Sequence, residues 1–158
     1  MKYTNMDIQR ATAADAENIL HLQRVAFISE AEIYNDFNIA PLSQSLDELK
    51  AEFNTHVFLK AIVDGQLIGS VRACVSVEDG TCYIQKLIVH PDFQNSRVGT
   101  TLMNRIEQIF TDCKRFVLWT GHKSSKNLGL YQKLGYRIFK TERIHDTLNL
   151  VYLEKLKK

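Results

Sequence analysis

A polar segment, QNSRVGT, occupies residues 94–100 between two apolar stretches. The stretch before it is typical of a buried strand, and residues 98–112 have apolar positions at helical spacing. The first backbone N–H groups of a helix have no partner within the helix and lie at the positive end of its dipole, so they attract anions. Amide and hydroxyl side chains, one glycine and one arginine therefore favour a pyrophosphate as the ligand of this loop.

Two common phosphate-binding motifs are excluded. The chain contains neither the glycine-rich Walker sequence that ends in lysine and serine or threonine, nor the GxGxxG fingerprint of dinucleotide-binding folds. Polar residues are also common at helix N-termini that bind nothing. The loop alone therefore leaves a helix cap without a ligand open as an alternative.

The elements around this loop follow from periodicity, turn signals and cap signals. Hairpin turns are expected at Asp64-Gly65 and Asp79-Gly80, and capping boxes at Thr12/Asp15 and Ser45/Glu48. The resulting order is β-α-α-β-β-β-α-β-α-β-β. It predicts an α/β layered fold with a mixed, mostly antiparallel central sheet and helices on both faces.

Composition limits the class of protein. A length of 158 residues fits a single domain over residues 1–158, and a net charge of +2 gives no support for nucleic acid as a partner. The chain has no apolar run long enough to cross a bilayer and no secretion signal at its start, so we expect a cytoplasmic protein without a membrane partner. Cys74, Cys82 and Cys113 show no ligand spacing and are interpreted as reduced core thiols, which leaves no metal site.

The segment VHPDFQNSRVGTTLM resembles the acyl-CoA-binding signature of the GNAT superfamily of N-acetyltransferases. Val89, Pro91, Gln94 and Gly99 stand in register with that signature, and an apolar helix follows. A second segment, LGLYQKLGYRIF, resembles the family's helix that carries a tyrosine and ends in leucine, glycine and an aromatic residue. Two motifs at the expected separation make the resemblance specific, and the strand order extends it over nearly the whole chain.

The resemblance implies acetyl-CoA as the donor co-substrate, and no metal. Its pyrophosphate would lie at the loop, and its pantetheine arm would pair with free backbone groups at Leu87 to Val89, in the strand expected over residues 81–89. The residues expected to contact coenzyme A are Leu87, Ile88, Val89, Gln94, Asn95, Ser96, Arg97, Val98, Gly99, Thr100, Ser124 and Asn127.

This chain departs from the family pattern at two positions. Arg97 stands where the family usually has its first glycine, which is acceptable if that position has helical dihedral angles. The guanidinium of Arg97 would then bind a phosphate, or else lie in solvent as an ordinary arginine at a helix end. Ser124 stands seven residues before the family's tyrosine, where many members carry asparagine, and Asn127 lies four before it. Either could reach the pantetheine arm, and Asn127 could equally cap a helix.

The resemblance implies a general acid at Tyr131, because a phenol with a pKa of about 10 is still protonated at neutral pH. The alternative is an ordinary core tyrosine. A lysine-like amine, with a pKa of about 10.4, would need a base to become nucleophilic. Strand alternation puts Tyr83, Gln85 and Leu87 on one face of residues 81–89. No glutamate lies on this strand, so the base is not identified.

Acidic and aromatic residues gather in FISEAEIYNDFN, residues 27–38. In the GNAT architecture the first two helices and the loop between them usually form a wall of the acceptor site. The residues expected to contact the acceptor are Glu30, Glu32, Tyr34, Asp36 and Gln85. Acidic groups beside aromatic rings suit a small cationic amine, although a solvated acidic surface is the alternative. A peptide N-terminus and a protein lysine stay open as acceptors.

Three functions are compatible with these patterns. The leading hypothesis is acetyl transfer from acetyl-CoA to a primary amine by direct attack in a ternary complex. The second is a catalytically silent CoA-binding sensor or interaction module, favoured by the replaced glycine and the missing acidic residue. The third, a structural domain without a cofactor, leaves residues 94–100 unexplained. Exposed strand edges near the C-terminus would allow a homodimer.

Overall fold

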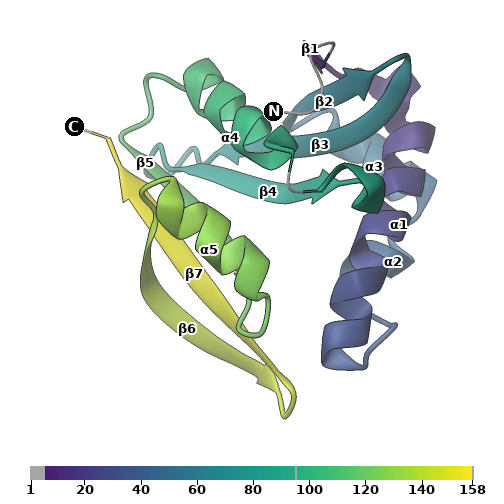
Figure 1. Cartoon of the computed structure of the whole chain (residues 1–158). Helices are drawn as coiled ribbons and strands as arrows, with labels where there is room; N and C mark the ends of the chain where they lie inside the picture. Colours follow the sequence, from purple (N-terminus) through teal and green to yellow (C-terminus); the bar gives the residue numbers. More distant parts are fainter. Residues whose placement is uncertain (1–5, 95, 158) are drawn as a thin grey trace.

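The computed structural model of this chain describes residues 6–94 and 96–157. Within these residues, seven strands form one sheet in the order β1-β2-β3-β4-β5-β7-β6, with helices on both faces (Figure 1). Neighbouring strands are antiparallel except β4 and β5, which run parallel. The expected fold class, a mixed and mostly antiparallel sheet between helices, is confirmed.

The chain order agrees with the order expected from the sequence, with one additional short helix, α2. The strands are β1 (Asp7–Arg10), β2 (Val57–Val63), β3 (Gln66–Val75), β4 (Cys82–Val89), β5 (Arg115–Gly121), β6 (Arg137–His145) and β7 (Leu148–Leu156). The helices are α1 (Ala16–Tyr34), α2 (Ala40–Ser43), α3 (Leu46–Glu52), α4 (Val98–Ile109) and α5 (Ser125–Lys133). In the described residues, no helix is both long and apolar enough to span a membrane.

The local signals explain why these elements begin and turn where they do. At the start of α3, the Ser45 N–H donates to Glu48 Oε1 at 2.8 Å and the Glu48 N–H donates to Ser45 Oγ at 3.1 Å, which completes the expected capping box. Between β2 and β3, Asp64 and Gly65 both have positive φ, 51° and 79°, as a tight hairpin requires. Both predictions are confirmed.

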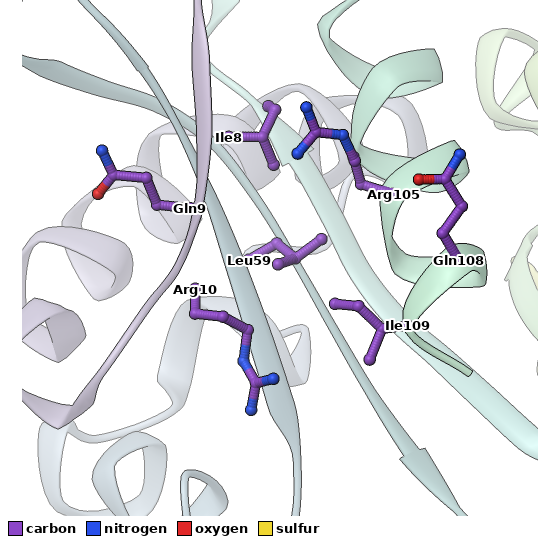
Figure 2. Close-up of a pocket in the computed structure, with 7 residues that line it drawn as sticks. All are labelled: Ile8, Gln9, Arg10, Leu59, Arg105, Gln108 and Ile109. Atoms are coloured by element: carbon purple, nitrogen blue, oxygen red, sulfur yellow. The ribbon is translucent and has the colours of Figure 1, made fainter. Parts of the chain in front are cut away.

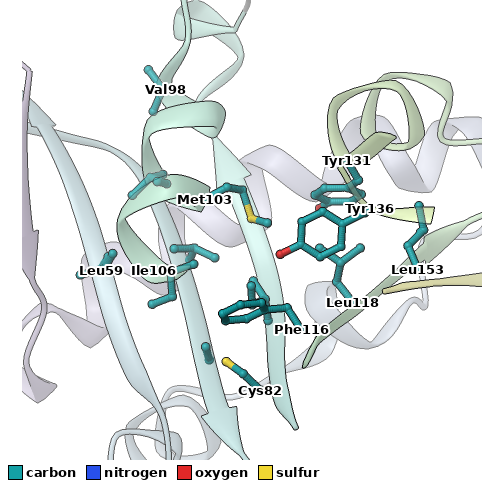
Figure 3. Packing of buried hydrophobic residues seen from close by; sticks show 14 of the residues in the cluster. Leu59, Cys82, Val98, Met103, Ile106, Phe116, Leu118, Tyr131, Tyr136 and Leu153 are labelled. Atoms are coloured by element: carbon teal, nitrogen blue, oxygen red, sulfur yellow. The ribbon is translucent and has the colours of Figure 1, made fainter. Parts of the chain in front are cut away.

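The core lies in two layers, one on each face of the sheet. Against one face, α4 and α5 pack through Val98, Leu102, Met103, Ile106 and Tyr131 (Figure 3). Against the other face, α1 and α3 pack through Ile19, Leu20 and Leu49, with Phe58 of β2 among them. The layer under α4 and α5 therefore includes the tyrosine that the sequence singles out.

One element boundary differs from that expected. α4 ends at Ile109 instead of residue 112, and Ile109 is 38% exposed. β6 continues to His145, because β7 supplies pairing partners along its length. Sheet pairing, which lies far away in sequence, decides the length of β6.

Candidate active site

The parallel strands β4 and β5 separate soon after they begin. Their pairing comprises Cys82 with Phe116 and Tyr83 with Val117. β3 pairs with β4 as far as Val89, and β7 pairs with β5 as far as Gly121. Among the described residues, β5 therefore provides no ladder partner for residues 84–89, and this edge of β4 faces a gap in the sheet. Residues 87–89 were expected to offer free backbone groups here.

A β-bulge interrupts β4 at the same place. Arg72 lies opposite Gln85 and Ser70 opposite Ile88, so a single residue of β3 faces both Lys86 and Leu87. Lys86 has a positive φ of 51°. An extra residue reverses the alternation of side chains beyond it.

The expectation that Gln85 and Leu87 share a face is therefore wrong. Gln85 lies on the α1 side of the sheet with its partner Arg72, whose guanidinium donates to Gln23 of α1 at 2.7 Å. Leu87 lies on the α4 side, where its Cδ2 would be 3.6 Å from a Cβ placed on Gly99. Two-residue alternation holds only for a strand without a bulge.

Among the described residues, no side-chain hydrogen bond caps the N-terminus of α4. Arg97 occupies the cap position with φ 68° and ψ 12°, and its side chain is exposed. The condition for a non-glycine residue here, helical dihedral angles at Arg97, is therefore not met, because the chain enters α4 through the left-handed conformation that glycine favours. For a residue with a Cβ this conformation costs about 1 kcal/mol. The guanidinium of Arg97 has no acceptor atom, so it cannot cap the first N–H groups of α4, from Val98 to Thr100.

Other loop residues differ in what they can offer a ligand. Gln94 is exposed, whereas Ser96 is buried and its hydroxyl donates to the Phe93 carbonyl. Val98 is buried in the core, so its backbone N–H is the group it can present. Gly99 lies so close to α5 that a Cβ there would be 3.3 Å from Leu130 Cδ2. Asn95 lies outside the described residues.

Hydrogen bonds join the C-terminal half of α1 to the start of α5. The Lys123 N–H donates to Tyr34 Oη at 2.8 Å, and Tyr34 Oη lies 2.9 Å from Ser124 Oγ. The Ser124 hydroxyl donates to Glu30 Oε1 at 2.5 Å. A consistent direction follows: the Tyr34 hydroxyl donates to Ser124, and Ser124 donates to the Glu30 carboxylate. We refer to Glu30, Tyr34 and Ser124 as the α1–α5 relay.

A glycine makes room for this relay. A Cβ on Gly121, at the end of β5, would lie 2.0 Å from Tyr34 Oη and 2.5 Å from Tyr34 Cζ, distances that atoms do not adopt. The pattern of the sequence did not single out Gly121, because its partner lies on α1. Asn127, one turn beyond Ser124, donates from Nδ2 to Thr120 Oγ1 at 3.2 Å.

Tyr131 lies in α5, buried beside Tyr136 with ring centroids 6.2 Å apart (Figure 3). Burial raises the pKa of the Tyr131 phenol, and the negative charge of Glu30 raises it further. The hydroxyl is therefore protonated at neutral pH, and the Glu30 carboxylate is near enough to affect it. The structure brings together Glu30, expected at the acceptor site, Ser124, expected to contact coenzyme A, and Tyr131, expected as the general acid.

The remaining residues expected at the acceptor site are more dispersed. Glu32 is exposed on α1. Asp36 accepts a hydrogen bond from the Asn38 N–H at 2.9 Å, and its Oδ2 lies 3.7 Å from His145 Nε2 at the end of β6. Asp36 therefore lies between α1 and the β6–β7 hairpin, whereas Glu32 is not brought into the relay.

A polar cavity of about 270 Å³ lies beside the bulge, lined by Ala40, Ser43, Gln44, Glu48 and Lys86. Burial lowers the pKa of the half-buried Lys86 amine, and the charge of Arg72 lowers it further, while Glu52 opposes both. Arg72 itself is fully buried, with Nη1 3.0 Å from Glu52 Oε1. This cavity was not expected from the sequence.

A second cavity, of about 280 Å³, lies between β1 and α4 (Figure 2). It is lined by Ile8, Gln9, Arg10, Leu59, Arg105, Gln108 and Ile109. None of these residues was expected at the donor or acceptor site, and none belongs to the α1–α5 relay.

Comparison with known proteins gives consistent results. The chain has a TM-score of 0.76 and 19% identity to a PaiA N-acetyltransferase from Thermoplasma acidophilum in complex with coenzyme A, covering 96% of this chain and 98% of that one. It has a TM-score of 0.79 and 12% identity to the ribosomal-protein-S18-alanine N-acetyltransferase from Escherichia coli, covering 97% and 95%. An N-acetyltransferase from Staphylococcus aureus Mu50 gives 0.77 and 17%, covering 98% and 100%.

At these identities the solved structures establish the fold. The family comes from the sequence model of the acetyltransferase (GNAT) family, which matches residues 17–136. That range includes α1, the bulged β4, the α4 loop and the whole of α5. The chain therefore belongs to the GNAT family of acetyltransferases.

Proposed function

We propose that this protein transfers an acetyl group from acetyl-CoA to a primary amine in a ternary complex. The observation that carries the proposal is the gap between β4 and β5, which opens beside the N-terminus of α4, where the cap residue Arg97 makes no side-chain hydrogen bond to the helix. In a member of the GNAT family, these two features supply a free strand edge and a set of anion-binding N–H groups next to each other.

Coenzyme A fits these features. The N–H groups of Val98, Gly99 and Thr100 would receive the pyrophosphate, and Arg97 is exposed at their side. The pantetheine arm would extend along the free edge of Leu87, Ile88 and Val89. The Thermoplasma acidophilum relative holds coenzyme A in its structure, which supports this ligand class. Asn127, in the first turn of α5, would contact the arm through its backbone N–H, because its side chain already has a partner. Ser124 would touch the arm only by van der Waals contact, because its hydroxyl and its backbone N–H and C=O already have partners.

We assign the general base to Glu30. Its carboxylate accepts from the Ser124 hydroxyl through Oε1, which fixes its orientation and leaves Oε2 for a proton. The raised pKa of Tyr131 is partly caused by Glu30, so the two groups lie within electrostatic reach of each other. A carboxylate at this position would attract a cationic amine and then take a proton from it.

We assign the general acid to Tyr131. As the neutral amine forms the new C–N bond and the C–S bond breaks, the phenol would give its proton to the departing sulfur. The proton that the nitrogen loses as the amide forms would restore the phenol. Burial destabilises a phenolate and a thiolate alike, so the raised pKa of Tyr131 is compatible with this transfer.

The acceptor is proposed to be a small cationic amine. Glu30 and Asp36 place negative charge on the C-terminal part of α1 and just after it, and Gln85 lies on the same side of the sheet as α1. Glu32 would act through its charge alone, since it is exposed. Tyr34 would contribute indirectly to the wall of the acceptor site, because its hydroxyl holds Ser124 in the α1–α5 relay.

The proposal is tested by measuring release of free thiol from acetyl-CoA with amines of different size and charge. We expect saturable, amine-dependent release of free thiol, with diamines preferred over amino-acid amides that have an uncharged side chain. Glu30→Gln should lower turnover by about 100-fold, the lower range for loss of a general base, without changing the acetyl-CoA dissociation constant. Turnover unchanged in Glu30→Gln would remove Glu30 from this role.

A catalytically silent CoA-binding module is the second candidate. The left-handed backbone at Arg97 favours it, because a residue with a Cβ and a long side chain stands where a close approach to phosphate is needed. Tight binding of acetyl-CoA without thiol release with any amine would support this alternative over catalysis.

A further inference from the structure

β6 is the outer strand of the sheet, and no further strand of the described residues pairs with its outer edge (Figure 1). All nine of its residues are exposed. Three of them are large and apolar: Ile138 is 47% exposed, Phe139 40% and Ile144 47%. An edge strand presents unpaired N–H and C=O groups, and another strand can pair with them.

The charges of β6 are complementary to those of a second β6 running in the opposite direction. When two copies pair about Thr141, Lys140 of each copy lies opposite Glu142 of the other, so two opposite-charge pairs form. Centring the pair on Lys140 or on Glu142 would instead place two like charges directly opposite each other, which is unfavourable. The charge sequence therefore selects the arrangement about Thr141.

The side chains that would form these pairs already lie on one face. Lys140 Nζ is 4.7 Å from the centroid of the Tyr152 ring, and Glu142 Oε1 accepts from the Tyr152 hydroxyl at 3.0 Å. Phe139 also packs on this ring, with centroids 6.4 Å apart. A partner strand would thus meet an ordered group of two charges and two aromatic rings.

The pairing between β6 and β7 shifts register on either side of this segment, between Ile138 and Lys140 and between Arg143 and His145. Bulges and lysine residues often protect an edge strand from unwanted pairing. Here the bulges limit regular backbone to residues 140–143, and this segment carries the complementary charges. The exposed Ile138 and Ile144 flank it and would be covered at the two ends of the contact.

We propose that this chain forms a two-fold symmetric homodimer in which β6 pairs with β6 of a second copy about Thr141. The same patch is used by both copies, as in closed dimers generally. The two sheets would join edge to edge, and the proposal does not depend on acetyl transfer.

The oligomeric state of the wild type and of three charge variants tests this arrangement by sedimentation equilibrium across the micromolar range. Wild type should approach twice the 18.2 kDa of one chain. Lys140→Glu and Glu142→Lys should each weaken the dimer by at least about tenfold, because symmetry makes every substitution act twice. The double variant should restore it. An equimolar mixture of the two single variants should form heterodimers, since both of its pairs are again opposite in charge.

Control substitutions with the same charge changes are Lys133→Glu in α5 and Glu78→Lys in the β3–β4 turn, both exposed and outside β6. They should leave the dimer unchanged. Circular dichroism confirms folding of each variant. A monomeric wild type throughout the range would overturn the proposal. So would dimers that persist in both single variants, or single variants that stay monomeric when mixed.

Discussion

Gly121→Ala should destabilise the protein through a clash with Tyr34. The φ of Gly121 is not left-handed, so the backbone accepts alanine, and the new methyl group would lie 2.0 Å from Tyr34 Oη. The tyrosine ring must move by more than an ångström to relieve this contact. That movement breaks the bonds from Lys123 N–H and to Ser124 Oγ. Overpacking together with two lost hydrogen bonds amounts to about 3 kcal/mol.

Urea denaturation at equilibrium measures this loss. Gly129→Ala is the matched control, because Gly129 lies within α5 and a Cβ there meets no atom within 4 Å. Alanine is a better helix former than glycine, so the control should stabilise the protein by about 0.5–1 kcal/mol.

A double-mutant cycle identifies the contact. Tyr34→Phe removes the hydroxyl that lies nearest to the new methyl group and should cost about 1–2 kcal/mol by itself. Gly121→Ala combined with Tyr34→Phe should be less destabilised than the sum of the single variants, because the worst clash is gone. Strict additivity, or a Gly121→Ala variant as stable as Gly129→Ala, would refute the packing of Tyr34 on Gly121.

Three further predictions concern single side chains. Tyr131→Phe should lower turnover by about 100-fold while the acetyl-CoA dissociation constant stays constant, whereas equal loss of both would indicate a packing role. Arg97→Gly should raise the free energy of unfolding by about 0.5–1 kcal/mol, because glycine accepts a φ of 68°. The same substitution should weaken CoA binding in calorimetry. A lower free energy of unfolding would contradict the left-handed backbone at this position. Glu52→Gln should flatten the acid side of the stability profile in pH-dependent urea denaturation. Burial disfavours the Glu52 carboxylate, but the charge of Arg72 more than offsets this and lowers the pKa of Glu52 from 4.5. The ion pair therefore stabilises the protein above pH 4.5, and this stabilisation is lost as the pH falls. An unchanged stability profile in Glu52→Gln would contradict a stabilising pair between Glu52 and Arg72.

Local signals in the sequence predict most of the fold. The Ser45/Glu48 capping box and the Asp64-Gly65 turn depend on residues within four positions of each other, and both occur as expected. The loop before α4 was also located, because a polar segment between apolar periodic stretches is a local pattern. These features need no information from distant parts of the chain.

The bulge in β4 could not be predicted in this way. Nothing in CYIQKLIV indicates that Lys86 takes a positive φ, since the extra residue arises from register with β3. Its consequence is functional, because it turns Gln85 and Leu87 to opposite faces. Strand alternation fails wherever pairing inserts a residue.

The α1–α5 relay was likewise hidden in the sequence. Glu30 and Ser124 were expected on the acceptor and donor sides respectively, yet they are hydrogen-bonded to each other over 94 positions of sequence. Gly121 gave no signal, since the requirement for glycine comes from Tyr34 on a distant helix. Contacts of this separation are set by the topology of the sheet.

The measurement that tests the central claim most directly is calorimetric titration with acetyl-CoA, followed by thiol release from the same protein with a diamine. We expect saturable binding, retained with dephospho-CoA because the pyrophosphate is unchanged, and amine-dependent release of thiol. Binding without release for any amine would contradict catalysis and leave a CoA-binding module. Absence of binding at millimolar ligand would contradict the assignment of the β4–β5 gap and the α4 N-terminus as the donor site.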